Sequence, residues 1–419
     1  MKKSPTLLMA TPSYAPEMTG VGRYAGELAR GLVDRGFDVS VVTTPPHYPG
    51  WYVRAPYRAS RYCHETLENV DVWRCPIFVP KRAGGLYRLL SSLSFGLTSA
   101  PVLVWRILTT RPDIVVCVEP TLAVTPALLF ASKIVGARCV LHVQDIELDA
   151  ALAVGHIHLS GWILRLAMGI DRFIRRRFDR VITISSTMVQ NLERKGVDSS
   201  KIRLIRNWVD TDRIRPMDGA PAYRAELGID PGETVCLYSG QIGRKQALDL
   251  VLQAAQLMKD VARFRFVIAG DGPELPNLKK QFGNLPNIIF LPLQPEERLS
   301  EFLNLADIHL LPQHADMNEL VLPSKLGGML ASGGRILVTA HGDSELALFL
   351  DGSADMVAPG NPMLIVAALD RMAGALDETQ DNRLALARSI SSEVCLAQFD
   401  SLLRGLMPIH ALDMSKQDA

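Results

Sequence analysis

Two cations follow a glycine-rich turn in the second half of the sequence. The segment 240–245 reads GQIGRK and comes directly after Thr234–Ser239, an apolar run typical of a buried strand. Cations oppose the positive amino end of a helix dipole, so Arg244 and Lys245 before a helix indicate a bound anion, the alternative being a solvated charge pair. A diphosphate that gains charge as its bond breaks needs such a cation. We therefore expect a diphosphate at Gly240, Gln241, Arg244 and Lys245.

A second glycine pair precedes the helical run 24–35 in the first half of the chain. Glycines at a helix start let Gly20 and Gly22 bring free N–H groups to a phosphate; a plain turn is the alternative. With Ala25 they match the dinucleotide-binding pattern. However, the eight-residue loop 12–19 separates them from the first strand, and the second strand ends in two threonines rather than an acidic residue. These features exclude a dehydrogenase.

Two further turns carry polar groups at strand or helix ends. The residues after the apolar run 264–269 are Gly270, Asp271 and Gly272, which could face a base or a ribose or could form a structural turn. The block 320–328 reads LVLPSKLGG. Its Pro-Ser step offers backbone N–H groups to a phosphate or to sugar hydroxyls, the alternative being an ordinary helix cap. The candidates in this block are Leu322, Ser324 and Lys325.

An imidazole and three carboxylates follow one another at the end of the strand-like run 138–143. The segment 142–149 reads HVQDIELD. His142 and Gln144 lie on one face of an extended chain, and Asp145 begins the loop. A buried, satisfied histidine is the usual interpretation of a lone strand histidine. The concentration of ionisable groups favours a sugar or acceptor site instead, and it adds Glu147 and Asp149 to the candidates.

Strand-like and helix-like patterns alternate along the whole chain, which predicts an α/β fold with parallel sheets covered by helices on both faces. The expected strands are short apolar runs bounded by Gly, Pro or a charge, at 6–11, 38–43, 113–118, 138–143, 179–184, 234–239, 263–269, 287–291, 307–311 and 335–339. The polar segment 207–218 has no period and predicts a crossing between two domains. Two such domains face each other across a cleft, and ligands of open α/β sheets bind at the carboxyl ends of the strands.

Composition limits the classes of function. The 45 basic and 44 acidic residues give a net charge of +1, so no global field attracts nucleic acid. Six scattered cysteines without a C-x-x-C pair argue against a zinc site and a disulfide framework and fit a reducing cytoplasm. The apolar run 6–11 is too short for a signal peptide, and the uncharged run 89–105 is too short to span a bilayer.

Two segments combine apolar and basic residues in a way that predicts contact with a membrane surface. The segment 162–180 mixes Trp, Leu, Ile and Phe with six arginines, and the apolar run 86–108 follows Arg82 and has Arg88 and Arg106 near its two ends. Basic amphipathic helices of this kind lie in the interface of anionic bilayers. We expect the arginines 175–177 to contribute to this binding. A core helix with a solvated basic face is the alternative.

Together these blocks resemble family 4 of the retaining glycosyltransferases, which have two Rossmann-like domains in the arrangement called GT-B. Within the family the chain looks like the colanic-acid and O-antigen subfamily, which transfers fucose or N-acetylfucosamine. The resemblance spans roughly residues 7–406. Its blocks are HVQDIELDAALAVG, RNWVDT, YSGQIGRKQAL, NLADIHLLPQ and LVLPSKLGGMLASG.

The resemblance implies roles for the candidate donor residues. Gly20 and Gly22 approach the donor diphosphate from the N-terminal domain. An Arg and a Lys of the C-terminal domain usually neutralise that diphosphate. The Lys corresponds to Lys245, whereas Gln241 stands where Arg or Asn is usual, so Arg244 compensates.

The paired glutamates of the family are not intact in this sequence. Glu319 takes the place of the first, while Gly327 and Gly328 occupy the place of the second. The Ser324–Lys325 block replaces the pair in this subfamily. On the acceptor side, the usual histidine corresponds to Gln144.

The resemblance also implies a domain plan, partners and a location. Residues 1–208 with a returning C-terminal helix, 387–419, form the acceptor-side domain, and 209–386 bind the nucleotide sugar. The donor is a GDP- or UDP-linked hexose or deoxyhexose, and the acceptor is a polyprenyl-diphosphate-linked sugar of exopolysaccharide or lipopolysaccharide synthesis. No metal cofactor is needed, and the enzyme is cytoplasmic and peripheral at the anionic inner leaflet. A sugar-nucleotide epimerase of the same fold and a non-catalytic binding subunit are the alternatives.

Overall fold

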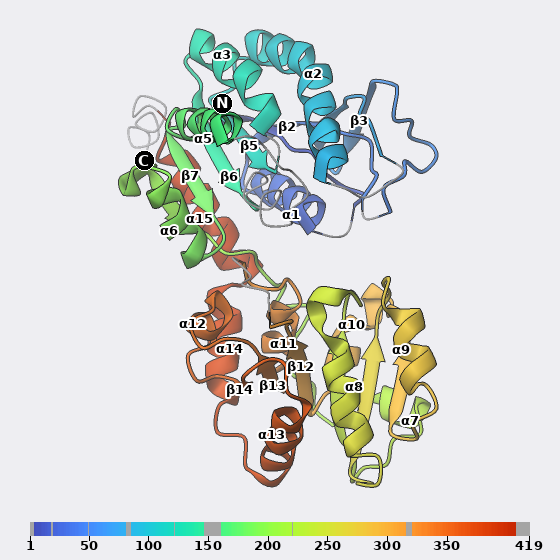
Figure 1. Ribbon diagram of the computed structural model, residues 1–419. Helices are drawn as coiled ribbons and strands as arrows, with labels where there is room; N and C mark the ends of the chain where they lie inside the picture. The colour runs from blue at the N-terminus through green and yellow to red at the C-terminus, as the bar shows by residue number, and fades with distance from the viewer. Residues whose placement is uncertain are drawn as a thin grey trace. The chain divides into compact units, whose positions relative to one another are not determined.

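The chain forms two compact units. In this computed structural model the described residues are 4–17, 20–48, 50–80, 85–120, 122–145, 161–219, 221–315 and 321–407. Unit 1 comprises Met1–Arg206 and Leu396–Ala419, and unit 2 comprises Asn207–Cys395 (Figure 1). The chain therefore passes to unit 2 at the start of the polar segment 207–218. It returns to unit 1 at Leu396, later than the expected position 387.

The sheet of unit 1 has eight strands in the order β3-β4-β2-β1-β5-β6-β7-β8. All neighbouring strands are parallel except β3 and β4, which are antiparallel. The strands are β1 Thr6–Ala10, β2 Asp38–Thr43, β3 Cys63–Leu67, β4 Val70–Arg74, β5 Ile114–Glu119, β6 Arg138–Val143, β7 Arg180–Thr183 and β8 Ile202–Leu204. The helices are α1 Gly20–Asp34, α2 Gly85–Thr110, η1 Leu122–Val124, α3 Thr125–Val135, α5 Gly161–Arg175, α6 Ser186–Arg194 and η2 Ser199–Lys201.

Unit 2 contains a six-stranded parallel sheet in the order β11-β10-β9-β12-β13-β14. Its strands are β9 Thr234–Ser239, β10 Phe264–Ala269, β11 Ile288–Leu291, β12 Ile308–Pro312, β13 Arg335–Thr339 and β14 Asp355–Val357. Its helices are α7 Ala222–Glu226, η3 Arg244–Gln246, α8 Leu248–Leu257, α9 Leu275–Phe282, η4 Glu296–Arg298, α10 Leu299–Leu303, α11 Leu326–Ser332, α12 Glu345–Leu350, α13 Pro362–Gly374 and α14 Gln380–Ser389.

The ten expected strands are all present, because continuous apolar runs leave a buried parallel strand as the favoured structure. Four strands were not expected. β3 is half-buried to exposed along its length, and β8 and β14 have three residues each. β4 alternates buried with half-buried residues and lies next to β2. Such short or one-sided strands lack the continuous apolar run that marks the others.

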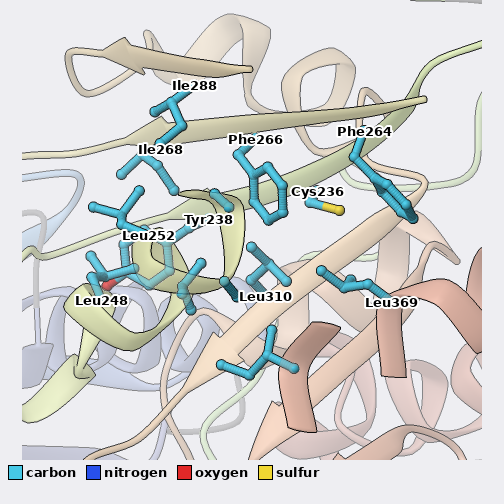
Figure 2. Packing of buried hydrophobic residues seen from close by; sticks show 14 of the residues in the cluster. Cys236, Tyr238, Leu248, Leu252, Phe264, Phe266, Ile268, Ile288, Leu310 and Leu369 are labelled. Carbon is cyan, nitrogen blue, oxygen red and sulfur yellow. The ribbon is translucent and has the colours of Figure 1, made fainter. Parts of the chain in front are cut away.

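One core cluster of unit 2 lies between the sheet and the helices α8, α9 and α13, and two further clusters pack other strand residues against α10, α11 and α12. Figure 2 shows Phe264, Phe266 and Ile268 of β10 pointing toward Leu252 of α8 and Leu369 of α13. Burying side chains of this size contributes about 1.5–3 kcal/mol each, so the sheet is a rigid base for the loops at its edge.

The last helix, α15 Ser392–Arg404, packs on unit 1 through its C-terminal part. A Cβ at Gly31 of α1 would meet Leu396 Cδ1 at 2.7 Å, so the two helices lie close together at this glycine. Phe399 lies edge-on to His142 with the ring centroids 5.2 Å apart, and Arg404 donates to the carbonyl of Arg35 at 2.7 Å. These contacts confirm that the chain end crosses back to the N-terminal domain.

Helix α5 turns a charged face inward and an apolar stripe outward. Trp162, Leu166, Ile170 and Phe173 follow one another at helical spacing, and each is more than half exposed. Arg175 lies on the inner face with a side chain that is 0% exposed. The expectation that Arg175 contacts a membrane is therefore wrong, since the guanidinium belongs to the core.

Arg175 is held by two carboxylates. Its Nη1 and Nη2 donate to both oxygens of Glu119 at 2.6 and 2.8 Å, and its Nε donates to Asp171 at 2.9 Å. Burial raises the pKa of the Glu119 carboxyl, and Arg175 opposes that rise. The bidentate pair attaches α5 to the carboxyl end of β5.

One helix among the described residues meets the length and composition of a membrane span. This is Tyr87–Thr110 within α2, of which 28% is buried. The same helix packs on α3 and η1 (Figure 1), and a Cβ at Gly96 would lie 2.7 Å from Ala123 Cβ. The close approach shows that α2 is part of the packing of unit 1.

Replacing Arg175 with Leu should destabilise unit 1 by about 3–5 kcal/mol, because it leaves the buried Glu119 carboxylate without its partner. The matched control is Arg177→Leu on the exposed side of the same turn, which should change the free energy of unfolding by less than about 0.5 kcal/mol. Urea unfolding followed by circular dichroism measures both. Equal effects of the two substitutions would contradict a buried ion pair.

Candidate functional site

Two glycine loops of unit 2 lie directly against each other at the carboxyl edge of its sheet. The N–H of Gly240 donates to the Ala269 carbonyl at 3.0 Å, and the N–H of Ile242 donates to the Asp271 carbonyl at 2.8 Å. A Cβ at Gly270 would lie 1.8 Å from the Gly240 oxygen, and one at Gly272 would lie 2.1 Å from the Ile242 oxygen. The sequence-predicted donor residues Gly240, Gln241, Gly270, Asp271 and Gly272 therefore come together in one backbone platform.

Lys325 lies beside this platform. Its Nζ is 3.9 Å from the centroid of the Tyr238 ring and 3.7 Å from the position that a Cβ at Gly240 would take. The Tyr238 hydroxyl donates to the Gln241 carbonyl, which fixes the ring under the loop. The ammonium is thus held over an aromatic face next to the glycine turn, where it can meet an anion.

Arg244 and Lys245 form η3 at the end of the same loop, and both side chains are exposed. The carbonyl of Lys245 accepts a hydrogen bond from the His314 N–H at 2.9 Å, which connects the loop after β9 to the loop after β12. Three cations, at 244, 245 and 325, therefore lie on loops at the carboxyl edge of one sheet. This arrangement can bind a doubly charged phosphate group.

Neighbouring side chains fill the space beside Gly327 and Gly328, the positions that correspond to the family's second glutamate. A Cβ at Gly327 would lie 2.9 Å from Val209 Cβ, and a Cβ at Gly328 would lie 2.9 Å from Leu303 Cδ1. A glutamate fits at neither place without a shift of its neighbours. Of the other candidates in this block, Leu322 is half-buried and Ser324 is exposed, and Glu319 lies outside the described residues.

The predicted phosphate glycines of unit 1 lie in the first turn of α1 rather than before it. Gly20 has φ +58°, a conformation that favours glycine, and a Cβ at Gly22 would lie 2.8 Å from Glu17 Cβ. Glu17 is buried, and its Oε1 accepts the N–H groups of His47 and Tyr48 at 2.6 and 2.8 Å. Its Oε2 has no hydrogen-bond partner in the described structure.

Arg74 makes a second connection between the loops after β1 and β2. Its side chain is buried and donates to the carbonyls of Thr44 at 3.0 Å and Ala15 at 2.6 Å, while its Nε donates to Glu65. Sequence reasoning identified neither Glu17 nor Arg74. The segment WRCP around Arg74 has no hydrophobic periodicity that would have indicated its role. An arginine at the end of a strand is nevertheless unusual, and this feature could have identified Arg74.

His142 and Gln144 lie together at the end of β6, as the alternation predicts. The Gln144 amide donates to His142 Nε2 at 3.0 Å, so the ring proton is on Nδ1, which has no partner in the described structure. Burial lowers the pKa of His142 to about 3. The imidazole is therefore neutral at physiological pH and suited to hydrogen bonding rather than proton release. Asp145 is exposed, and Glu147 and Asp149 lie outside the described residues.

Both halves of the chain match family models of glycosyltransferases. Residues 19–208 match the glycosyl transferase 4-like domain, and residues 220–372 match glycosyl transferases group 1. The chain is 36% identical over 406 residues to the putative colanic acid biosynthesis glycosyl transferase WcaI of Escherichia coli (strain K12), covering 94% of this chain and 98% of the relative. The chain is a family 4 glycosyltransferase. The predicted family and enzyme class are confirmed.

Solved structures confirm that this glycosyltransferase has the GT-B fold. A glycosyltransferase from Rickettsia africae ESF-5 matches with a TM-score of 0.70 at 14% identity, over 96% of this chain and 98% of that one. Anabaena HepE in complex with UDP and glucose matches with a TM-score of 0.63 at 16% identity, over 96% and 100%. WaaG, a glycosyltransferase involved in lipopolysaccharide biosynthesis, matches with a TM-score of 0.62 at 14% identity, over 95% and 100%.

The buried neutral His142 predicts a pH dependence of stability. A histidine whose folded pKa lies below its unfolded value of about 6.5 contributes its full stability above that pH and loses it as the pH falls toward about 3. His142→Asn should therefore flatten the decline in unfolding free energy between pH 6 and 4 by about 1.4 kcal/mol per pH unit. Chemical unfolding at several pH values measures the slope; parallel curves for the two proteins would show that His142 is not buried neutral.

Proposed function

We propose that this glycosyltransferase moves a hexosyl or deoxyhexosyl group from a GDP- or UDP-sugar to a polyprenyl-diphosphate-linked sugar. The observation that carries the donor half is the platform of unit 2, where backbone glycines and the cations at 244, 245 and 325 gather at one sheet edge. The similarity to WcaI along nearly the whole chain supports a role in bacterial exopolysaccharide synthesis of the colanic-acid or O-antigen kind.

The chemistry follows from charge. As the bond from the sugar to the donor diphosphate breaks, negative charge grows on the leaving oxygen, and a fixed ammonium lowers the energy of that state more than that of bound donor. Lys245 and the backbone N–H of Gln241 supply this stabilisation, because the N–H groups of Gly240, Ile242 and Gly243 already donate within unit 2. No metal is then required. The leaving phosphate oxygen takes the acceptor proton on the same face, and the sugar keeps its anomeric configuration.

The acceptor and the membrane contact belong to unit 1. The exposed apolar stripe of α5 is accompanied by the exposed Arg165, Arg172 and Arg177, a combination that suits an anionic bilayer surface. A peripheral enzyme on the cytoplasmic face of the inner membrane would meet a lipid-linked sugar there.

Incubation of the purified enzyme with radiolabelled nucleotide sugars and extracted bacterial lipid-linked acceptors tests the proposal. Label should move from nucleotide to lipid, with retained configuration by NMR and undiminished rate in EDTA. Label that stays on an altered nucleotide sugar would indicate an epimerase, and binding without turnover would indicate a non-catalytic subunit. Inversion, or loss of rate on chelation, would contradict the mechanism.

Lys245→Ala should lower kcat by about 10²–10³, because one preorganised charge donor in the transition state is removed. Thermal unfolding should be unchanged, since the side chain is exposed. Lys245→Arg should restore part of the rate, and the neighbouring Arg244→Ala is the control with the smaller loss. A folded Lys245→Ala enzyme with wild-type kcat would place the diphosphate elsewhere.

Replacing Leu166, Ile170 and Phe173 together with Gln should abolish cosedimentation with phosphatidylglycerol vesicles, because these side chains form the outward stripe of α5. Stability should not fall. The control replaces Leu257 and Leu376 of unit 2, which are also more than half exposed, and should bind vesicles like wild type. Unchanged binding by the α5 variant would show that this stripe does not contact lipid.

A further inference from the structure

Aromatic side chains are concentrated in the loop after β2. The segment 47–62 contains four of the nine tyrosines, at positions 48, 52, 57 and 62, and one of the five tryptophans, Trp51. Tyr48 is 41% exposed and Trp51 is half-buried. Exposed rings in a loop at the carboxyl edge of a parallel sheet are placed where ligands of such sheets bind. The loop belongs to unit 1, whereas the glycine loops proposed to bind the donor belong to unit 2.

The loop is anchored rather than loosely attached. Glu17 accepts the backbone N–H groups of His47 and Tyr48, Arg74 donates to the Thr44 carbonyl, and the Tyr52 N–H closes a turn onto the His47 carbonyl at 3.2 Å. As a result the Tyr48 ring lies at the amino end of α1, 3.8 Å from the position of a Cβ at Gly20. A preorganised aromatic surface binds with less loss of side-chain entropy than a mobile one.

A cation stands next to these rings. The guanidinium of Arg88, from the first turn of α2, lies 5.6 Å from the centroid of Trp51. Arg88 is exposed, and in the described part of the chain no carboxylate forms an ion pair with it. A guanidinium positioned by an aromatic ring and not neutralised by a carboxylate is suited to a phosphate or diphosphate.

Apolar side chains continue from this cation along α2. Leu89, Leu93 and Leu97 follow at intervals of four residues, so they form a row on the helix surface. All three are exposed, Leu97 to 78%. The row leads along α2 away from its amino end.

We propose that Tyr48, Trp51 and Arg88 form the acceptor subsite of this enzyme. The sugar of the acceptor stacks on the two rings, which offer an apolar face to its C–H groups. Its diphosphate binds Arg88, and the first part of its lipid chain lies on the leucine row of α2. Along the surface, the aromatic rings are followed by the cation and then by the apolar row. In the ligand, the sugar is likewise followed by the diphosphate and then by the lipid. This inference rests on the proposed function and names the residues that receive the acceptor.

The matched control is a second cation–aromatic pair in the same loop. Arg54 is exposed, lies 5.1 Å from the centroid of Tyr52 and donates to its hydroxyl at 2.8 Å. It thus resembles Arg88 in charge, exposure and aromatic contact, but it is not followed by the leucine row. Arg54→Gln therefore separates a site at Arg88 from a general effect of positive charge.

The test measures binding of three probes to the full-length enzyme by calorimetry: farnesyl diphosphate, farnesyl diphosphate carrying one glucose, and UDP. Arg88→Gln should weaken both lipid probes about tenfold, and Arg54→Gln should not. Trp51→Ala should weaken the glucose-bearing probe about fivefold more than farnesyl diphosphate, because only the sugar stacks on the ring. Affinity for UDP should not change in any variant.

Two results would overturn the subsite. One is equal binding of the lipid probes by Arg88→Gln and Arg54→Gln; the other is a loss confined to UDP, which would assign the loop to the nucleotide. If either result is obtained and the wild-type enzyme still transfers label to lipid, the proposed function holds and the subsite is wrong. Wild type that neither binds the lipid probes nor transfers label would contradict both.

Discussion

Backbone contact between two glycine loops determines the shape of the platform at the carboxyl edge of unit 2. The 240–243 loop lies so close to the 270–272 loop that a single Cβ at Gly270 or Gly272 would overlap a carbonyl oxygen. Two hydrogen bonds between the loops satisfy backbone groups that would otherwise face solvent. The positions of Tyr238, Lys325 and the cations of η3 all depend on this contact, since each is held against or within one of the two loops.

Unit 1 stabilises its loops by a different means. Its carboxyl edge is fixed by buried charged side chains: Glu17 and Arg74 connect the loops after β1 and β2, and Glu119 with Arg175 attaches α5. Burying such charges costs free energy, and the hydrogen bonds that Glu17, Arg74 and Arg175 make offset part of that cost.

The sequence predicted those features that depend on continuous local patterns. Buried strands such as β9 were predicted from their apolar runs, and the residues of the donor platform were found individually because glycines and cations follow strand ends. The stacking of Lys325 on Tyr238 joins residues far apart in the chain and leaves no local pattern. Arg175 was assigned to the membrane because it stands in an arginine-rich run, although Asp171 four residues earlier is a helical partner that indicates an inward pair. Glu17 is a single glutamate in a loop, so no hydrophobic periodicity in the sequence indicated its role.

In the proposed function, the donor diphosphate binds the glycine loops and the cations of unit 2. Under the proposed function, the lysines carry more of the binding, because glycines stand at 327 and 328 in place of the second glutamate. The most direct measurement is a crystal structure of the enzyme with UDP or GDP. Diphosphate oxygens should lie within hydrogen-bond distance of Lys245 or Lys325 and of the Gln241 N–H. A diphosphate bound only at unit 1, away from all three, would contradict it.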